Sequence, residues 1–85
     1  MSEASRNQAL RASLLARLPV WQSAAARAQR LATHRAADVT DALRAVEDYR
    51  LLAHDLATAR RLMPQSRVRE YLEGTYALAH ATVHR

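Results

Sequence analysis

Apolar residues recur at helical spacing along almost the whole of this chain, and few residues interrupt them. The 85 residues include one glycine, two prolines and no cysteine. Alanine and leucine repeat at i, i+3 and i+4, whereas the strict alternation typical of strands is absent from the sequence. The pattern therefore predicts an all-α fold in which Pro19 and Pro64 mark the places where helices break.

The first helical segment is predicted from about residue 7 to residue 34. Proline suits the first turn of a helix and disrupts its interior, so Pro19 indicates either a kink or a fresh helix start. Residues 1–17 are then an N-terminal arm or helix extension, less well ordered than a three-helix domain over 18–85. The inward face of the segment consists of Leu10, Leu14, Leu18, Trp21, Ala25, Ala28 and Ala32.

Two further helices are predicted after a short connection at residues 35–37. Asp38 can cap the second helix, which is expected to run to Met63. Pro64 prevents its continuation, and Ser66 can cap a third helix that runs to the end of the chain. We expect an antiparallel helical hairpin plus a third helix, which together form a three-helix bundle. Its core anchors are expected to be Trp21, Tyr49, Leu52, Leu56, Leu72 and Tyr76.

A chain of this length has a small core and needs another source of stability. Such a domain buries only about 60 to 65% of the surface of its unfolded chain, and without cysteine it forms no disulfides. Leu51 and Leu62 lie outside the main apolar sector of the second helix, and Leu43 lies on its far side. Because three helices cannot bury all of these leucines, we expect a dimer or higher homo-oligomer.

Charge is divided unevenly among the helices. The net charge is +5, and all 13 basic residues are arginine. The first helical segment is purely basic, whereas Asp41, Asp48 and Asp55 form one stripe along the second helix at seven-residue spacing. In an antiparallel hairpin, Arg17 is expected near Asp55 and Arg30 near Asp41.

Arg60 falls within the inward, apolar sector of the second helix on a helical wheel. It is too far around that helix to pair with Asp55. Because the link at Pro64 folds the third helix back, we expect Glu73 as its first partner and Glu70 as its second. The alternative is that Arg60 faces open space and binds lipid phosphate or an acidic group of a partner.

No catalytic, cofactor or metal site is predicted. His80 and His84 are four residues apart, a spacing that allows two imidazoles to share a metal, but the glutamate of the zinc-protease helix is missing. A role on the flank of the helix is therefore favoured. The sequence also lacks a cysteine nucleophile, a glycine-rich phosphate loop and a recognisable serine, histidine and acid motif. We expect no enzyme activity and no cofactor.

Nucleic-acid binding is the main alternative from another functional class. The second helix, the short link and the start of the third helix imitate a helix-turn-helix, with Arg67 and Arg69 at the N-terminus of the recognition helix. The second helix is longer than that motif uses, and Glu70 and Glu73 would lie near the phosphates. Nucleic acid is therefore not the expected partner.

From Pro19 onward, and most clearly over residues 46–85, the chain resembles the N-terminal region of the stage II sporulation protein M family of multi-pass membrane proteins. Each shared residue is a common one in helices, but their order and spacing are distinctive. The matching residues are Arg17, Trp21, Tyr49, Asp55, Leu56, Ala57, Ala59, Arg60, Ser66, Val68, Tyr71, Leu72, Ala79 and His80. The chain departs from the family's pattern in the alanines of residues 24–28, at Gly74 and Thr75, and in the arm before Arg17.

The resemblance implies a non-catalytic helical domain on the cytoplasmic side of a bacterial inner membrane. Its expected role is that of a scaffold and protein-interaction module in envelope or membrane-associated complexes. The family continues into transmembrane helices, so contact with the membrane is expected through residues beyond this chain. Two alternatives stay open: an arginine-rich nucleic-acid-binding domain and a free-standing helical oligomerisation module.

Overall fold

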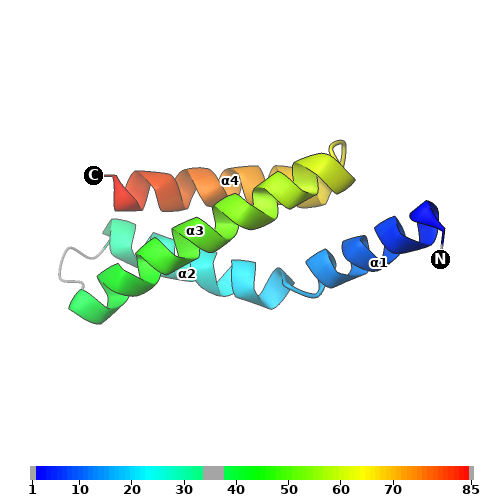
Figure 1. Cartoon of the computed structure of the whole chain (residues 1–85). Helices are drawn as coiled ribbons and strands as arrows, with labels where there is room; N and C mark the ends of the chain where they lie inside the picture. The colour runs from blue at the N-terminus through cyan, green and yellow to red at the C-terminus, as the bar shows by residue number, and fades with distance from the viewer. Residues whose placement is uncertain (1, 34–37, 85) are drawn as a thin grey trace.

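The computed structural model describes residues 2–33 and 38–84, and within these it contains four α-helices and no strand. The helices are α1 (Glu3–Leu15), α2 (Leu18–Thr33), α3 (Val39–Leu62) and α4 (Arg67–Val83). Helices α2, α3 and α4 pack against one another, and α1 extends from this bundle beside the C-terminal part of α3 (Figure 1). The predicted all-α bundle is confirmed. The connection expected at residues 35–37 lies outside the described residues.

The predicted first segment consists of two helices with a break between them. Helix α1 ends at Leu15 and α2 begins at Leu18, so Pro19 lies in the first turn of α2, where its missing N–H removes no helical hydrogen bond. Pro19 therefore accompanies a fresh helix start and not a kink within one helix. Residues 3–15 form a regular helix, and Ser2 caps it by accepting a hydrogen bond from the Ser5 N–H.

The other two helices begin at the predicted capping residues. Asp38 Oδ1 accepts a hydrogen bond of 2.8 Å from the Asp41 N–H. Ser66 Oγ accepts one of 3.1 Å from the Arg69 N–H and donates one of 2.7 Å to the Met63 carbonyl. The short link around Pro64 is thus closed by Ser66 from both sides, and α4 runs back along α3 as an antiparallel neighbour (Figure 1).

The core lies where α2, α3 and α4 meet. Trp21, Leu52 and Leu72 are fully buried, and Leu56 is nearly so. The Trp21 ring also approaches Tyr71 of α4, with centroids 6.4 Å apart, so the indole packs against α4 as well as α3.

Tyr49 and Tyr76, the other two expected anchors, are only half-buried at the edge of the core. Their rings stack with centroids 5.2 Å apart, and their hydroxyl oxygens are 3.0 Å apart in a hydrogen bond. This hydrogen bond, and secondly burial, raises the pKa of Tyr49 above its usual value.

Helix α1 covers part of the surface for which the leucine pattern predicted a second copy. Leu14 of α1 is buried in the same cluster against which Leu51 packs. Leu51 and Leu62 are half-buried, and Leu51 packs against the cluster that contains Leu14 of α1. The chain therefore does not fully bury the three leucines, as expected, and the homo-oligomer predicted from them stays a prediction. Leu43 remains 62% exposed. No helix over the described residues is long and apolar enough to cross a membrane.

Candidate functional site

A buried polar cluster joins α2 to the middle of α3. Asp55 of α3 is only 3% exposed. Its Oδ2 accepts a hydrogen bond of 2.6 Å from Arg17 Nε and another of 2.7 Å from Trp21 Nε1. A carboxylate is costly to bury unless it is paired and hydrogen-bonded, and these two donors meet that need.

The pairing of Arg17 with Asp55 agrees with the expected register, whereas the indole contact was not foreseen. One signal could have indicated it: a buried tryptophan N–H needs an acceptor, and Trp21 lies four residues after Arg17. Both donors come from the break between α1 and α2, because Arg17 precedes Leu18 and Trp21 lies in the first turn of α2. The cluster therefore fixes the point from which α1 diverges.

Helix α1 is held against α3 by two further contacts. Leu14 is buried against the core, and Arg11 Nε donates a hydrogen bond of 3.2 Å to the Leu62 carbonyl near the C-terminal end of α3. Together with Arg17, these contacts are spread along α1 from its middle to its end. They set the angle and the spacing between α1 and α3.

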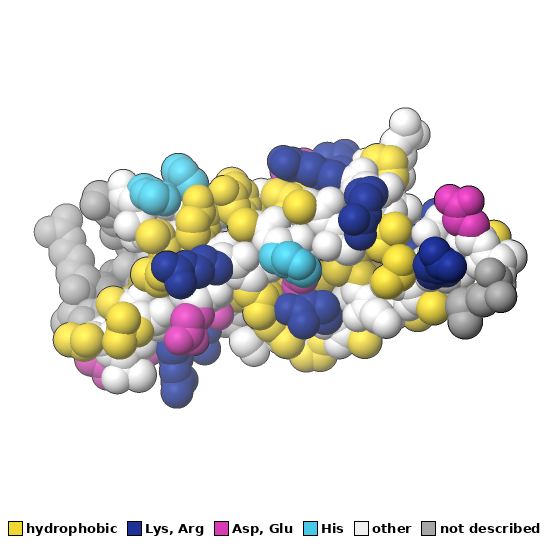
Figure 2. All heavy atoms as spheres, viewed as in Figure 1, with side chains coloured by type: hydrophobic (Ala, Val, Ile, Leu, Met, Phe, Trp, Pro, Cys, Tyr) yellow, Lys and Arg dark blue, Asp and Glu magenta, His cyan; other side chains and the backbone are white. Residues whose placement is uncertain are grey.

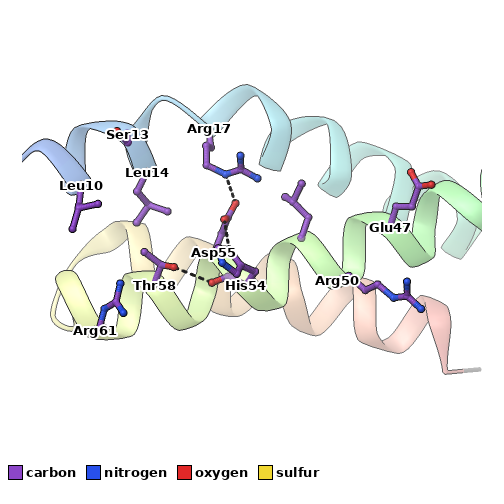
Figure 3. A pocket seen from close by; sticks show the side chains of 11 residues that line it. Leu10, Ser13, Leu14, Arg17, Glu47, Arg50, His54, Asp55, Thr58 and Arg61 are labelled. Atoms are coloured by element: carbon purple, nitrogen blue, oxygen red, sulfur yellow. Dashed lines mark hydrogen bonds and ion pairs between the residues drawn. The ribbon is translucent and has the colours of Figure 1, made fainter.

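An open groove of about 780 Å³ lies between α1 and α3 (Figure 3). Leu10, Ser13 and Leu14 of α1 form one wall, opposite the C-terminal part of a single face of α3, with Asp55 and Arg17 between them. Glu47 and Arg50 continue the α3 face beyond the end of α1. We call this the α1–α3 groove. Its lining residues are Leu10, Ser13, Leu14, Arg17, Glu47, Arg50, Leu51, His54, Asp55, Thr58 and Arg61.

The α1–α3 groove combines leucines from both walls with charged side chains at its edges. Leu10 is 42% exposed, so part of the apolar lining is open to solvent. Arg50 and Arg61 are exposed and make no hydrogen bond or ion pair to any described residue. The Asp55 carboxylate, in contrast, is buried and accepts hydrogen bonds from Arg17 and Trp21. The groove therefore presents an apolar strip bordered mainly by arginine.

The groove shows no arrangement of nucleophile and base within the described part of the chain. The Thr58 hydroxyl donates to the His54 carbonyl of its own helix. His54 Nδ1 is 3.4 Å from Asp55 Oδ1, a long contact, and its side chain is largely exposed.

His80 of α4 and His84, which follows its last residue, lie apart from the groove. Their ring centroids are 4.4 Å apart, and both rings contact Tyr49, at 5.7 Å for His80 and 5.4 Å for His84. Over the described residues, no group of three or more histidine, cysteine or acidic side chains could hold a metal ion. The pair therefore has the geometry of a ring cluster on the flank of the bundle.

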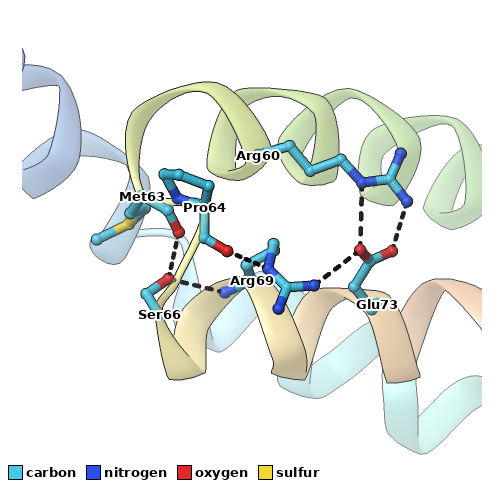
Figure 4. A network of polar contacts seen from close by, with 6 residues as sticks. All are labelled: Arg60, Met63, Pro64, Ser66, Arg69 and Glu73. Carbon is cyan, nitrogen blue, oxygen red and sulfur yellow. Dashed lines mark hydrogen bonds and ion pairs between the residues drawn. The ribbon is translucent and has the colours of Figure 1, made fainter.

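Arg60 and Glu73 form the bidentate pair that was expected, but on the surface (Figure 4). Arg60 Nη2 lies 2.6 Å from Oε1 and Nε lies 3.2 Å from Oε2 of the carboxylate. The Arg60 side chain is 58% exposed, so its guanidinium lies outside the apolar sector in which the helical wheel places this position. A helical wheel gives only the direction in which a residue leaves the backbone, whereas a long side chain can extend from there until its charged group reaches solvent.

Arg69 completes the network around Glu73. Its Nη1 lies 3.1 Å from Glu73 Oε2, and its Nε donates to the Pro64 carbonyl (Figure 4). Glu70, the second expected partner of Arg60, is exposed and makes no ion pair with any described residue. The network thus links the end of α3, the link at Pro64 and the start of α4.

The pKa of Glu73 leads to a test of this network. The hydrogen bonds from Arg60 lower that pKa below its usual 4.5, against the opposing effect of burial and with a further contribution from Arg69. A carboxylate whose pKa is lower in the folded state than in the unfolded state stabilises the fold. This stabilisation is fully present at pH values above the unfolded-state pKa, and it is lost as the pH falls through the folded-state pKa. Glu73→Gln should therefore lower the melting temperature at pH 7, and the difference from the wild type should vanish as pH falls well below 4.5.

Glu70→Gln is the matched control, because it removes a carboxylate from the same helix without removing an ion pair. Thermal unfolding followed by circular dichroism at pH 7 and pH 3 measures both variants. Because Glu70 lies in the first turn of α4, its own change has a small helix-dipole cost. A melting temperature of Glu73→Gln equal to that of the wild type at pH 7 would show that the network adds no stability.

The remaining acidic residues show how the helices are registered. Arg27 Nη1 donates to Asp48 Oδ2, and both side chains are mostly buried. Arg30, which was expected near Asp41, is exposed, and the described residues show no ion pair between them. Arg17 pairs with Asp55, and Arg27, ten residues later, pairs with the earlier Asp48. This reversed order is the one that antiparallel helices require.

The geometry of α3 and α4 differs from that of a helix-turn-helix. That motif crosses its helices at about 90 to 120°, whereas α3 and α4 lie side by side as an antiparallel hairpin (Figure 1). Arg69 is engaged by Glu73 and Pro64, so of the two arginines at the start of α4 only Arg67 is exposed. Nucleic-acid recognition by this pair of helices has no support in the arrangement.

Comparison with known proteins identifies one family. Residues 11–85 match the family described as "Domain of unknown function (DUF8413)". No curated protein and no solved structure matches the chain. The matched range includes α2, α3, α4 and the part of α1 from Arg11 onward, which carries Leu14. The family description makes no reference to stage II sporulation protein M, so that resemblance stays a prediction.

Proposed function

We propose that this chain, which belongs to the DUF8413 family, is a non-catalytic interaction module that holds an amphipathic helix of a partner protein in the α1–α3 groove. The observation that carries the proposal is the groove itself. It has leucines on both walls, and its width is set by contacts that involve buried side chains.

The shape of the groove suits a helix. Its lining residues on α3 follow one face from Glu47 to Arg61, which corresponds to roughly 20 Å at 1.5 Å per residue. A helix of about 15 residues has that length, and such helices bind grooves through apolar anchors at i, i+3, i+4 and i+7. Leu10 of α1 and the half-buried Leu51 of α3 provide the complementary apolar surface, whereas Leu14 lies buried beneath them.

The walls of the groove are already in place before any partner binds. Asp55 ties the start of α2 to α3, and Arg11 ties α1 to the end of α3. A site that is held in its binding geometry loses less conformational entropy when a ligand binds. This favours a docking role for α1 over that of a loose extension.

The wider setting of the proposal rests on the sequence resemblance alone. On that basis we propose that the module acts on the cytoplasmic side of a bacterial inner membrane, as a scaffold in envelope or membrane-associated complexes. The groove would then recruit a protein partner to that membrane.

Fluorescence of Trp21 tests the proposal, since it is the only tryptophan and its indole N–H is hydrogen-bonded to Asp55, which lines the groove. The probe is a helical peptide of about 15 residues with a leucine stripe and a polar face of glutamine and serine. We expect a saturable change in Trp21 emission, and Leu10→Gln should weaken the binding about tenfold.

Leu43→Gln is the control variant, because Leu43 is an exposed leucine of α3 outside the groove. It should bind the peptide as the wild type does. Equal affinities of the Leu10→Gln and Leu43→Gln variants would show that the groove is not the docking site, and absence of any binding by the wild type would refute the proposed function.

A further inference from the structure

We infer that the partner helix is acidic and that Arg50 and Arg61 select it by charge. This inference rests on the proposed function, since it concerns the occupant of the α1–α3 groove. It goes beyond that function because it names the chemistry of the partner and the residues that recognise it.

The first observation is that the two arginines are available. Arg50 and Arg61 both line the groove, both are exposed, and neither has a hydrogen-bond or ion-pair partner among the described residues. Other arginines of the bundle are engaged: Arg27 with Asp48, and Arg60 with Glu73. The fold therefore uses some arginines to join helices and leaves these two facing the groove.

The second observation is that the acids of the groove do not cancel this charge. Asp55 is buried, and its Oδ2 receives both Arg17 and Trp21. Glu47 is the only exposed acid among the lining residues, and it lies at the N-terminal end of the α3 wall. In Figure 2, arginine side chains are spread over α3 and α1 on this face, with acidic side chains at only a few places.

The spacing of the two arginines defines what the partner must present. Arg50 and Arg61 lie on the same wall of the groove, and they are separated by about three helical turns, or roughly 16 Å. A helix lying along α3 would meet both with carboxylates about 11 residues apart, beside its apolar stripe. Arginine can bind each carboxylate with two parallel hydrogen bonds, which fixes orientation as well as charge.

A second copy of this chain fits the groove poorly. Each copy carries a net charge of +5, and over residues 1–37 the only acid is Glu3. Two of the acids of α3, Asp48 and Asp55, are already paired with arginine. Electrostatic complementarity therefore favours a different, acidic protein over self-association.

The expected effect is a preference among peptides that share one leucine stripe. An exposed arginine–carboxylate pair changes a dissociation constant by up to about fivefold, so two pairs should distinguish acidic from neutral flanks by about tenfold. The preference should shrink when salt is raised well above 0.15 M, where charges are screened beyond about 8 Å.

The experiment uses three peptides with glutamate, glutamine or arginine flanks, titrated against the full chain and followed by Trp21 fluorescence. Wild type should bind the acidic peptide most tightly and the basic peptide least. Arg50→Glu/Arg61→Glu should reverse this order. The control, Arg30→Glu/Arg67→Glu, changes the net charge equally at exposed sites outside the groove and should keep the order of the wild type.

Each other outcome has a definite meaning. Equal binding of the three peptides, still weakened by Leu10→Gln, would overturn the charge inference and leave the proposed function intact, whereas no binding of any peptide would overturn both. Sedimentation that shows a dimer lost in Arg50→Glu/Arg61→Glu would replace the acidic partner by a second copy. Binding to phosphatidylglycerol vesicles that the same variant abolishes, without peptide binding, would replace it by a lipid surface.

Discussion

Replacing Trp21 with alanine is expected to destabilise this domain by about 3 to 5 kcal/mol, enough to unfold most of it. The Trp21 side chain is 1% exposed and packs where α2, α3 and α4 meet. Its removal leaves a cavity that the small side chains of the same cluster, such as Ala24 and Ala59, cannot fill. It also takes away one of the two hydrogen bonds to the buried carboxylate of Asp55.

Trp21→Phe separates these two contributions. Phenylalanine keeps much of the apolar volume and lacks the indole N–H, so its cost should be closer to about 1 to 3 kcal/mol. Urea unfolding followed by circular dichroism measures both variants. If Trp21→Ala had the unfolding midpoint of the wild type, the indole would have to lie on the surface, and a direct contact with a partner would become the better explanation for it.

The helices could be predicted from the sequence because their limits depend on local chemistry. Asp38 and Ser66 cap α3 and α4 through hydrogen bonds three residues along the chain. Pro64 follows the last residues of α3, and Pro19 lies in the first turn of α2. Each of these effects acts within one or two turns, so the sequence pattern contains it.

The partners of charged residues depended on information that the sequence does not hold. Arg27, and not Arg30, occupies the helical stripe facing α3, because the register of α2 on α3 is set by how the two helices pack. The position of α1 is a similar case. Its single buried residue, Leu14, gives little apolar periodicity, yet Leu14 and the hydrogen bond from Arg11 together hold α1 beside α3 as one wall of the groove.

The groove could not be predicted for the same reason. Its residues come from α1, from the break at Arg17 and from one face of α3. On that face, Leu51 was predicted to contact a second copy, and the structure adds that it packs at the edge of the core and lines the groove. A leucine outside the main apolar stripe of a helix therefore indicates that the helix has a second contact face. Which element or partner packs against that face depends on the fold.

Asp55→Ala is expected to cost about 3 kcal/mol, because it leaves the N–H of a buried indole without an acceptor and removes the partner of Arg17. Asp55→Asn should cost less, since an amide oxygen can still accept from Trp21. Arg17→Ala should also cost less than Asp55→Ala, because Arg17 is partly exposed and Asp55 keeps the indole donor. Urea unfolding at pH 7 ranks the three variants.

A double variant shows whether this cluster acts as one unit. Groups that share a hydrogen-bond network are not additive, so Arg17→Ala combined with Asp55→Ala should cost less than the two single changes together. Glu47→Ala is the control, because it removes an exposed carboxylate of the same groove that has no ion-pair partner among the described residues. Additive effects at Arg17 and Asp55, or a cost at Glu47 as large as at Asp55, would contradict the assignment of the cluster as the device that fixes α1 and shapes the groove.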